Sequence, residues 1–232
     1  MTGNIYLIPV TLGGEDYLSL IPEKVLTLTK QLRYFIVEDI RSARRFLRLI
    51  DREFPIDDTN FIELNEHTND SDLLNYLDPV QKGNNIGIMS EAGLPGIADP
   101  GSKIILLAHQ QNIRVIPLSG PSSIILALVS SGLNGQNFSF NGYLPVNPFE
   151  KKVKIRDLEN RAREGYSQIF METPYRNQKM FEALISTCKN DTMLCIAADI
   201  TLPSESIKTM NISEWKNNIP SLKGKLVIYV LQ

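Results

Sequence analysis

The sequence predicts two α/β domains, the first built around a mostly parallel sheet and the second around a mixed sheet. Up to residue 118, short apolar runs alternate with segments of helical periodicity, which is the order that parallel strands with crossover helices require. After residue 119 the alternation becomes irregular, and closely spaced strand patterns finish the chain. We therefore expect an N-terminal domain of residues 1–118 and a C-terminal domain of residues 119–232.

The composition supports a folded core and excludes several other kinds of protein. Of the 232 residues, 43% are hydrophobic, yet no run reaches the roughly 18 apolar residues of a membrane span. The formal net charge of −2 gives no overall basic field that would attract nucleic acid. The cysteines and histidines, Cys188, Cys195, His67 and His109, have no metal-binding spacing, so we expect no metal site. The first residues resemble a strand rather than a secretion signal, and we expect a cytoplasmic protein.

Each expected element rests on a local pattern. In the first domain, apolar runs bounded by turn-forming residues predict strands at 4–10, 34–37, 61–64, 86–89 and 114–118. Apolar spacings of three and four residues predict helices at 21–31, 41–53, 71–81 and 101–111. In the second domain, strands are expected at 138–143, 168–171, 193–198, 205–210 and 226–231. Helices are expected from residue 124, at 151–163, at 175–188 and around Trp215.

A glycine-rich loop at residues 90–101 follows the expected strand 86–89 and precedes a helix. In open α/β folds, ligands lie in the crevice at the carboxyl ends of the strands, where such loops are found. Gly93, Gly96 and Gly101 let the backbone approach a ligand closely or adopt positive φ. This loop is the first place to look for a ligand, although a tight strand-to-helix turn without a ligand explains the same pattern.

Two carboxylates, Glu38 and Asp39, come directly after the expected strand 34–37. Paired acids at the end of a strand can hold a substrate or accept a proton. Asp39 also has the alternative role of capping the next helix. His67 stands after the strand 61–64 and is a weaker candidate for a catalytic base, because a lone histidine at such a position is more often a surface or capping residue.

A stripe of arginines marks the expected helix 41–53. At 3.6 residues per turn, one face of this helix carries Arg41, Arg44, Arg45, Arg48 and Arg52, and the other face carries Phe46, Leu47, Leu49 and Ile50. A charged face is usually just solvated, but five arginines repel one another, so a phosphate partner is a competing explanation. A second, weaker basic cluster contains Lys151, Lys152, Lys154 and Arg156.

Residues 119–123 open a helix with a glycine, a proline and serines. The N–H groups and hydroxyls of such a helix start can bind a carboxylate or ribose hydroxyls, while capping by Ser122 or Ser123 needs no ligand. The glycine fingerprints of NAD-binding and P-loop proteins are absent, and so is the Gly-x-Ser-x-Gly elbow of serine hydrolases. These absences argue against three common α/β functions.

Several motifs in order along the chain resemble the tetrapyrrole methylase superfamily, the class III S-adenosylmethionine methyltransferases. They are Ile5-Tyr6-Leu7-Ile8-Pro9, Val37-Glu38-Asp39-Ile40-Arg41, Ser90-Glu91-Ala92-Gly93-Leu94-Pro95, Asp99-Pro100-Gly101 and Val115-Ile116-Pro117-Leu118-Ser119-Gly120-Pro121-Ser122-Ser123. Two later motifs, Phe170-Met171-Glu172-Thr173-Pro174-Tyr175-Arg176 and Lys223-Gly224-Lys225, resemble the branch that methylates cytidine 2′-oxygens of small-subunit ribosomal RNA. The resemblance covers nearly the whole chain.

The resemblance implies two α/β domains with S-adenosylmethionine in the cleft between them, usually in a homodimer, and RNA of the small ribosomal subunit as the partner. It implies a metal-free methyl transfer for which Glu38, Asp39 or Glu172 is the candidate base, with the phosphates docked by Arg41, Arg44, Arg45 and Arg48. By matching motifs, the cofactor is expected to contact Pro9, Ser90, Glu91, Ala92, Gly93, Pro121, Ser122, Ser123, Thr173 and Ala198.

The chain differs from the ribosomal RNA branch at several motif positions. Where that branch typically has Ala-Arg-Glu-Leu-Thr-Lys, this chain has Ala197-Ala198-Asp199-Ile200-Thr201-Leu202, which removes an arginine and a lysine. Two alternatives therefore stay open. One is a methyltransferase of the same fold that acts on a tetrapyrrole or another small molecule, and the other is a cofactor-binding protein without catalysis.

Overall fold

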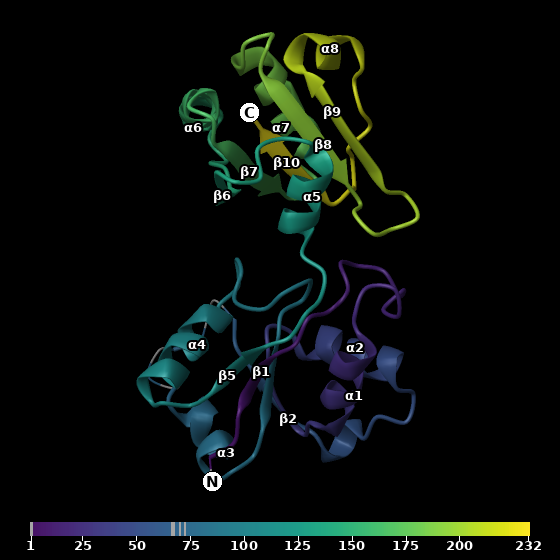
Figure 1. The fold of residues 1–232 in the computed structure, drawn as a ribbon, viewed down its shortest axis with the longest axis vertical. Coiled ribbons are helices and arrows are strands. Elements are labelled where there is room, and N and C mark those ends of the chain that lie inside the picture. The colour runs from purple at the N-terminus through teal and green to yellow at the C-terminus, as the bar shows by residue number, and fades with distance from the viewer. Residues whose placement is uncertain (1, 66–67, 70, 72) are drawn as a thin grey trace. The chain divides into compact units, whose positions relative to one another are not determined.

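The computed structural model describes residues 2–65, 68–69, 71 and 73–232. The chain forms two compact units, residues 1–122 and 123–232 (Figure 1). The sequence placed the boundary after residue 118, so the segment 119–122 falls in the first unit instead of the second. Each unit is an α/β structure with a five-stranded sheet, which confirms the predicted fold class.

The first sheet is entirely parallel. Its strands lie in the order β3-β2-β4-β1-β5. They are β1 (Ile5–Leu7), β2 (Tyr34–Val37), β3 (Asn60–Glu63), β4 (Ile86–Met89) and β5 (Val115–Pro117). The bounds of β2 and β4 match the prediction. Strand β1 is shorter than predicted, because Pro9 has no N–H with which to continue the ladder.

Helices cover both faces of this sheet. Helices α1 (Glu23–Gln31) and α2 (Ile40–Ile50) pack on one face through a shared apolar cluster, and α3 (Asp78–Gln81) and α4 (Gly101–Gln110) pack on the other. The predicted helix 71–81 is wrong in extent. Among the described residues of this stretch, a 3₁₀ turn (Asn75–Leu77) is followed by the short α3, because Pro79 fits only the first turn of a helix. A further 3₁₀ turn, Ile56–Asp58, precedes β3.

The neighbouring strands β1 and β4 lead to opposite faces of the sheet. The chain leaves β1 for α1 on one face, and it leaves β4 for α4 on the other. This divergence defines the crevice where ligands bind in open α/β sheets. Across it, Val10 N–H donates to the Gly93 carbonyl at 2.9 Å, so the loops after β1 and β4 meet at the carboxyl edge.

A third loop closes against these two. The backbone of Gly120, after β5, packs directly on Pro9, so that a Cβ at position 120 would lie 2.1 Å from Pro9 Cβ. Gly93 has φ +71°, and a Cβ there would lie 3.2 Å from Leu12 Cδ2 and 3.4 Å from the Pro121 carbonyl oxygen. Glycine at both positions allows three loops of the first unit to converge.

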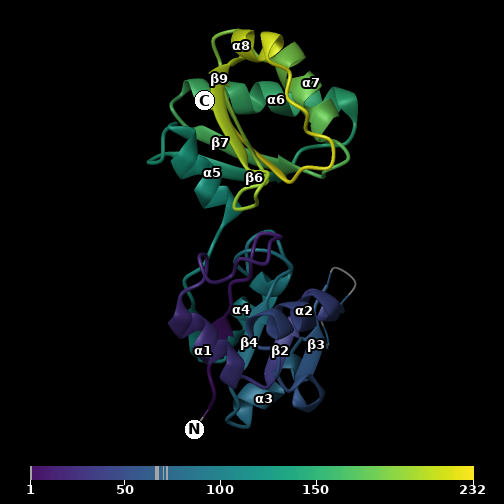
Figure 2. The same cartoon turned by 90° about the vertical axis from the view of Figure 1, so that its right-hand side faces the viewer.

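The second unit contains a mixed sheet in the order β6-β7-β10-β8-β9. Its strands are β6 (Phe138–Tyr143), β7 (Ser167–Glu172), β8 (Met193–Ala198), β9 (Ser206–Asn211) and β10 (Val227–Leu231). One face is covered by α6 (Pro148–Arg163), α7 (Asn177–Thr187) and α8 (Ile212–Asn217), whereas α5 (Ser123–Ser131) packs on the strands from the other side. Figure 2 shows α6 and α7 on one side of this sheet and α5 on the other. The predicted bounds of β6 and β8 are confirmed.

The pairing register of this sheet places the carboxyl ends of β7 and β8 next to the start of β10. Val227 of β10 pairs with Glu172, the last residue of β7, and with Ala198, the last residue of β8. The turn after β7, the loop after β8 and the loop before β10 therefore lie together. Hydrogen bonds join them, from Gly224 N–H to the Pro174 carbonyl at 3.2 Å and from Asp199 N–H to the Leu226 carbonyl at 2.7 Å.

We expect Gly120→Ala to lower the free energy of unfolding by about 1–3 kcal/mol, because the new methyl group overlaps the rigid ring of Pro9. The matched control is Gly135→Ala, since a Cβ at position 135 meets no atom within 4 Å. Urea unfolding of the two variants and the parent measures the difference. Equal stability of both variants would show that the loops after β1 and β5 are not packed as described.

Candidate functional site

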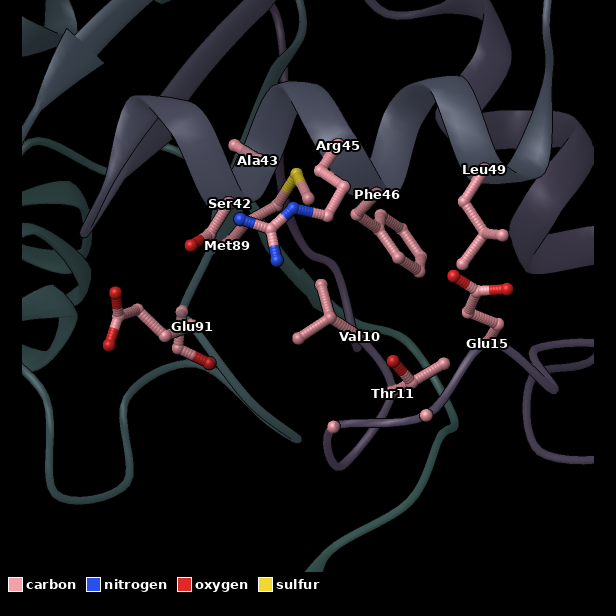
Figure 3. A pocket seen from close by; sticks show the side chains of 13 residues that line it. Val10, Thr11, Glu15, Ser42, Ala43, Arg45, Phe46, Leu49, Met89 and Glu91 are labelled. Atoms are coloured by element: carbon pink, nitrogen blue, oxygen red, sulfur yellow. The ribbon is translucent and has the colours of Figure 1, made fainter. Parts of the chain in front are cut away.

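A pocket of about 200 Å³ lies between the loops after β1 and β4 and the first turns of α2 (Figure 3). Its apolar walls come from the loop after β1, from the end of β4 and from α2, and its polar groups come from the loops and from Ser42 and Arg45 of α2. The lining residues are Val10, Thr11, Gly13, Gly14, Glu15, Ser42, Ala43, Arg45, Phe46, Leu49, Met89, Ser90 and Glu91. The pocket thus joins the predicted cofactor loop to the predicted arginine stripe.

Arg45 dominates the charge of this pocket. Figure 3 shows its side chain extending from α2 over the pocket, with Glu91 toward one end and Glu15 beside Leu49 at the other. Within the described residues, Arg45 has no acidic partner within the 4.0 Å of an ion pair. Its guanidinium is therefore available to a ligand that carries negative charge or hydrogen-bond acceptors.

Three carboxylates line an open hollow beside this pocket, Glu38 from the end of β2 and Glu91 and Asp99 from the loop after β4. Glu38 is half-buried, and its Oε2 accepts a hydrogen bond from Glu91 N–H at 3.1 Å. Burial raises the pKa of Glu38; the hydrogen bond from Glu91 opposes this, while the negative charges of Glu91, Asp99 and Asp39 add to it. Glu38 is therefore the carboxylate of this edge best suited to exchange a proton.

Asp39 has a different role from its neighbour. It is the N-cap of α2, and its Oδ1 accepts a hydrogen bond from Ser42 N–H at 2.7 Å. The hydrogen bonds from Ser42 lower the pKa of Asp39, although burial acts weakly in the opposite direction. The capping alternative that the sequence left open is thus the observed one, and it makes Asp39 a weaker proton acceptor than Glu38.

Asp99 organises the glycine loop from inside. Its two carboxylate oxygens accept hydrogen bonds from Gly96 N–H and Gly101 N–H, both at 2.7 Å. Burial raises the pKa of Asp99 in spite of these hydrogen bonds. Between Gly96 and Gly101 in the chain, Ala98 has φ +60°, a backbone conformation that costs a residue with a side chain about 1 kcal/mol or more. The hydrogen bonds to Asp99 therefore fix the backbone conformation of the glycine loop.

The predicted cofactor residues of the first unit converge around this loop. Pro9 is buried under Gly120, and Ser90 Oγ donates to the Ala92 carbonyl at 3.1 Å. Gly93 is joined to the β1 loop, and Pro121 is buried next to it. The structure therefore brings together Pro9, Ser90, Glu91, Ala92, Gly93 and Pro121, with Ser122 as the next residue.

The arginine stripe is present on α2 with one correction. Arg41, Arg44, Arg45 and Arg48 are exposed, while Phe46, Leu47 and Ile50 are buried. Arg52 lies beyond the end of α2 and does not continue the stripe as predicted, because the helix stops at Ile50. Arg44 lies over the ring of Phe61 at 5.4 Å, and Arg48 donates to the Arg52 carbonyl. Within the described part of the chain, none of the four helical arginines forms an ion pair.

The lysine cluster on α6 does not form the continuous basic surface that the sequence allowed. Lys151 is buried, and its Nζ lies 3.7 Å from Glu172 Oε2. Lys154 is paired with Asp157 at 3.2 Å. Because α6 begins at Pro148, Lys151 falls on the face that packs against the sheet, which the sequence pattern did not reveal.

Glu172 is part of a buried ion network in the second unit. Its Oε1 accepts from Thr173 N–H at 2.8 Å and from Arg176 Nε at 2.8 Å, with Arg176 Nη2 at 2.6 Å. Its side chain is fully buried and is also paired with Lys151. This arrangement orders the turn that carries Thr173, and it leaves little of the carboxylate accessible to an acceptor.

The other predicted residues of the second unit lie at the same sheet edge or at the start of α5. Ala198 ends β8, and the loop after it begins with Asp199 at φ +52°. Burial raises the pKa of Asp199, but the bonds from Leu226 N–H, Ser204 and Lys225 outweigh it and lower the pKa overall. Ser123 is the first residue of α5.

Sequence reasoning missed several residues of the first-unit site. Ser42, Glu15 and Leu49 line the pocket, and Asp99 shapes the glycine loop. Of these four residues, only Asp99 was indicated by the sequence, through the motif Asp99-Pro100-Gly101. Whether the other three line the pocket depends on which face of α2 lies toward the loops. His67 lies outside the described residues. Among those described, no group of three or more His, Cys, Asp and Glu side chains is placed to hold a metal ion, and no helix is long and apolar enough to cross a membrane.

Comparisons with known proteins agree with this architecture. The family model of tetrapyrrole (corrin/porphyrin) methylases matches residues 4–216. A protein of Vibrio cholerae named ribosomal RNA small subunit methyltransferase I is 28% identical over 97% of this chain and 76% of its own length. Its namesake in Buchnera aphidicola is 31% identical over 98% of this chain and 78% of its own length.

Two solved structures share the fold. The crystal structure of the methyltransferase CobJ has a TM-score of 0.63 at 16% identity and covers 99% of this chain and 94% of that chain. The uroporphyrin-III-C-methyltransferase from Thermus thermophilus has a TM-score of 0.57 at 14% identity and covers 100% of this chain and 92% of that chain. At these identities the likeness is one of fold.

Proposed function

This chain belongs to the family of tetrapyrrole (corrin/porphyrin) methylases, and on that basis we propose that it transfers a methyl group from S-adenosylmethionine to a ribose 2′-hydroxyl of small-subunit ribosomal RNA. The names of its relatives support this choice of substrate. The structural observation that carries it is the stripe of arginines on α2, which form no ion pair with any described residue. Arg45 of this stripe lines the same pocket as Ser90 and Glu91. RNA phosphates bound along α2 would thus lead to the cofactor loop.

The loops of both units fit the proposed cofactor. In the first unit, glycine at positions 93 and 120 lets the loops after β1, β4 and β5 pack closely, which gathers the proposed contact residues of that unit. In the second, Thr201 Oγ1 is buried without a hydrogen-bond partner among the described residues, in the loop directly after Ala198. We assign the cofactor contacts to Pro9, Ser90, Glu91, Ala92, Gly93, Pro121, Ser122, Ser123, Thr173 and Ala198.

Glu38 is our choice of general base among Glu38, Asp39 and Glu172. S-adenosylmethionine would supply a methyl group already activated by a positively charged sulfur, so the remaining task of the protein is to align the acceptor and to accept its proton. With Oε2 held by Glu91 N–H, Oε1 of Glu38 is available to take the proton of the attacking hydroxyl. Asp39 caps α2, and the carboxylate of Glu172 is shared between Arg176 and Lys151.

We further propose a homodimer in the cytoplasm, where ribosomal subunits are found. A region of exposed apolar side chains at the end of the edge strand β6 and on α6, namely Tyr143, Val146, Phe149 and Val153, supports a contact with a second copy.

The proposed function predicts cofactor binding together with methyl transfer. Calorimetric titration of the purified protein with S-adenosylmethionine should show binding, and tritium from the labelled methyl group should appear in undermethylated small ribosomal subunits. Subunits that already carry the modification are the control and should take up no tritium. Binding without transfer would reject the RNA substrate, and it would move the assignment to a small-molecule acceptor or to a protein without catalysis.

Glu38→Gln is expected to lower kcat for methyl transfer by about 100-fold or more, because a positioned base contributes about 10²–10⁴ in rate. In the parent enzyme kcat should fall as the pH drops through the raised pKa of Glu38, and this limb of the profile should disappear in the variant. Stopped assays of tritium transfer at a series of pH values measure both effects.

A measurement of thermal stability shows whether the loss of kcat in Glu38→Gln comes from the missing base or from unfolding of the variant. Because the pKa of Glu38 is raised in the folded state, its ionisation reduces stability as the pH rises from its unfolded-state pKa through its folded-state pKa. Glu38→Gln should therefore melt no lower than the parent above that range. Asp39→Asn keeps an N-cap acceptor and is the matched control, with kcat close to that of the parent. A Glu38→Gln enzyme with parental kcat would rule out Glu38 as the base.

Charge reversal of Arg44 and Arg48 to glutamate should weaken binding to the small ribosomal subunit and reduce its dependence on salt, while the affinity for S-adenosylmethionine stays unchanged. Sedimentation binding assays at several salt concentrations measure the change. The double variant Lys24→Glu and Lys82→Glu has the same net charge and alters exposed lysines away from the stripe. Equal subunit binding by the two double variants would remove α2 from the RNA interface.

A further inference from the structure

Tyr175 stands at the tip of a tight turn after β7. Arg176 N–H donates to the Thr173 carbonyl at 2.9 Å, which closes a four-residue turn with Pro174 and Tyr175 at its centre. Proline at the first central position presets the backbone of such a turn. Tyr175 is 91% exposed, the largest exposed fraction among the large hydrophobic residues that the structure describes.

The base of this turn is fixed on two sides. Beneath it, the buried carboxylate of Glu172 accepts bonds from Thr173 N–H and from the guanidinium of Arg176. Beside it, Gly224 N–H donates to the Pro174 carbonyl and ties the turn to the loop before β10. The turn that carries the exposed ring is therefore fixed by hydrogen bonds. Because the ring is not buried, it adds little to the stability of the fold.

Two exposed lysines stand on the segments that adjoin this turn. Lys179 is exposed on the first turn of α7, four residues beyond Tyr175, and exposed Lys223 precedes the tethered Gly224. Within the described part of the chain, neither lysine has an acidic partner within 4.0 Å. Of the acids in the loops at this edge, Glu172 is paired with Arg176 and Lys151, Asp199 is paired with Lys225, and Glu205 accepts a hydrogen bond from Thr201 N–H at 2.7 Å.

We propose that Tyr175 is a stacking platform for an unpaired base of the RNA, with Lys179 and Lys223 binding the neighbouring phosphates. This inference rests on the proposed function and adds a second RNA-binding surface, in residues 123–232. An exposed aromatic ring between uncompensated cations is the combination that binds single-stranded nucleic acid. A second copy of the chain fits this surface less well, because a two-fold contact would place the same lysines against each other.

The test compares Tyr175→Ala with Tyr175→Phe in the full-length protein. Loss of the ring should weaken binding to undermethylated small ribosomal subunits by about 5- to 100-fold and raise KM for the subunits, whereas phenylalanine keeps the stacking face and should retain parental affinity. Both variants should keep the parental melting temperature and S-adenosylmethionine affinity, since Tyr175 is 91% exposed. Tyr166→Ala removes a partly exposed tyrosine at the opposite end of β7 and should bind like the parent.

The possible outcomes separate this inference from the proposed function. Parental subunit affinity in Tyr175→Ala would overturn the stacking role while leaving the methyl transfer of the parent enzyme intact. A changed oligomeric state by light scattering with unchanged subunit affinity would assign Tyr175 to a contact between copies and would also overturn it. If the parent protein neither binds nor methylates the subunits, the proposed function itself fails, and with it the RNA partner of Tyr175.

Discussion

The loops after β1 and β4 must diverge to opposite faces of a parallel sheet and still remain bonded to each other, and the rest of the site depends on this constraint. The hydrogen bond from Val10 N–H to the Gly93 carbonyl bridges the point of divergence. It fixes the start of the glycine loop, so Glu91 N–H reaches Glu38 at the end of the neighbouring strand. The backbone geometry of one sheet edge thus decides which carboxylate is available for chemistry.

The two units place a buried or half-buried carboxylate in opposite electrostatic surroundings. Glu172 is fully buried, but two cations and a backbone N–H surround it, so its charge is compensated and the adjacent turn is held rigid. Glu38 is only half-buried, yet its neighbours include Glu91 and Asp99, and its pKa is raised. A folded protein gains no stability from that second arrangement. A raised pKa on a carboxylate at the carboxyl edge of a parallel sheet is typical of a group retained for proton transfer.

The sequence predicted much of the architecture because strand patterns are local. Apolar runs bounded by turn formers gave the limits of β2 and β4, and the motif at residues 90–95 marked the loop that follows β4. The sequence did not predict what depends on three-dimensional neighbours. Lys151 and Lys154 look alike in the chain, but α6 turns only Lys151 toward Glu172. Glu38 and Asp39 are adjacent, and only the start of α2 shows which of them is a cap.

The net charge of −2 is compatible with the proposed RNA substrate, because exposed charges act only over short distances. Screening limits the reach of exposed charges to about 8–10 Å, so an arginine stripe on α2 attracts phosphates whatever the distant acids do. In residues 123–232, Glu172 is paired with Lys151 and Arg176, and Asp199 is paired with Lys225. A chain with a net charge close to zero is expected to bind RNA weakly where its only contacts are with phosphates. Selective binding then requires that stacking and phosphate contacts be made together, which a folded ribosomal subunit can provide and random RNA rarely does.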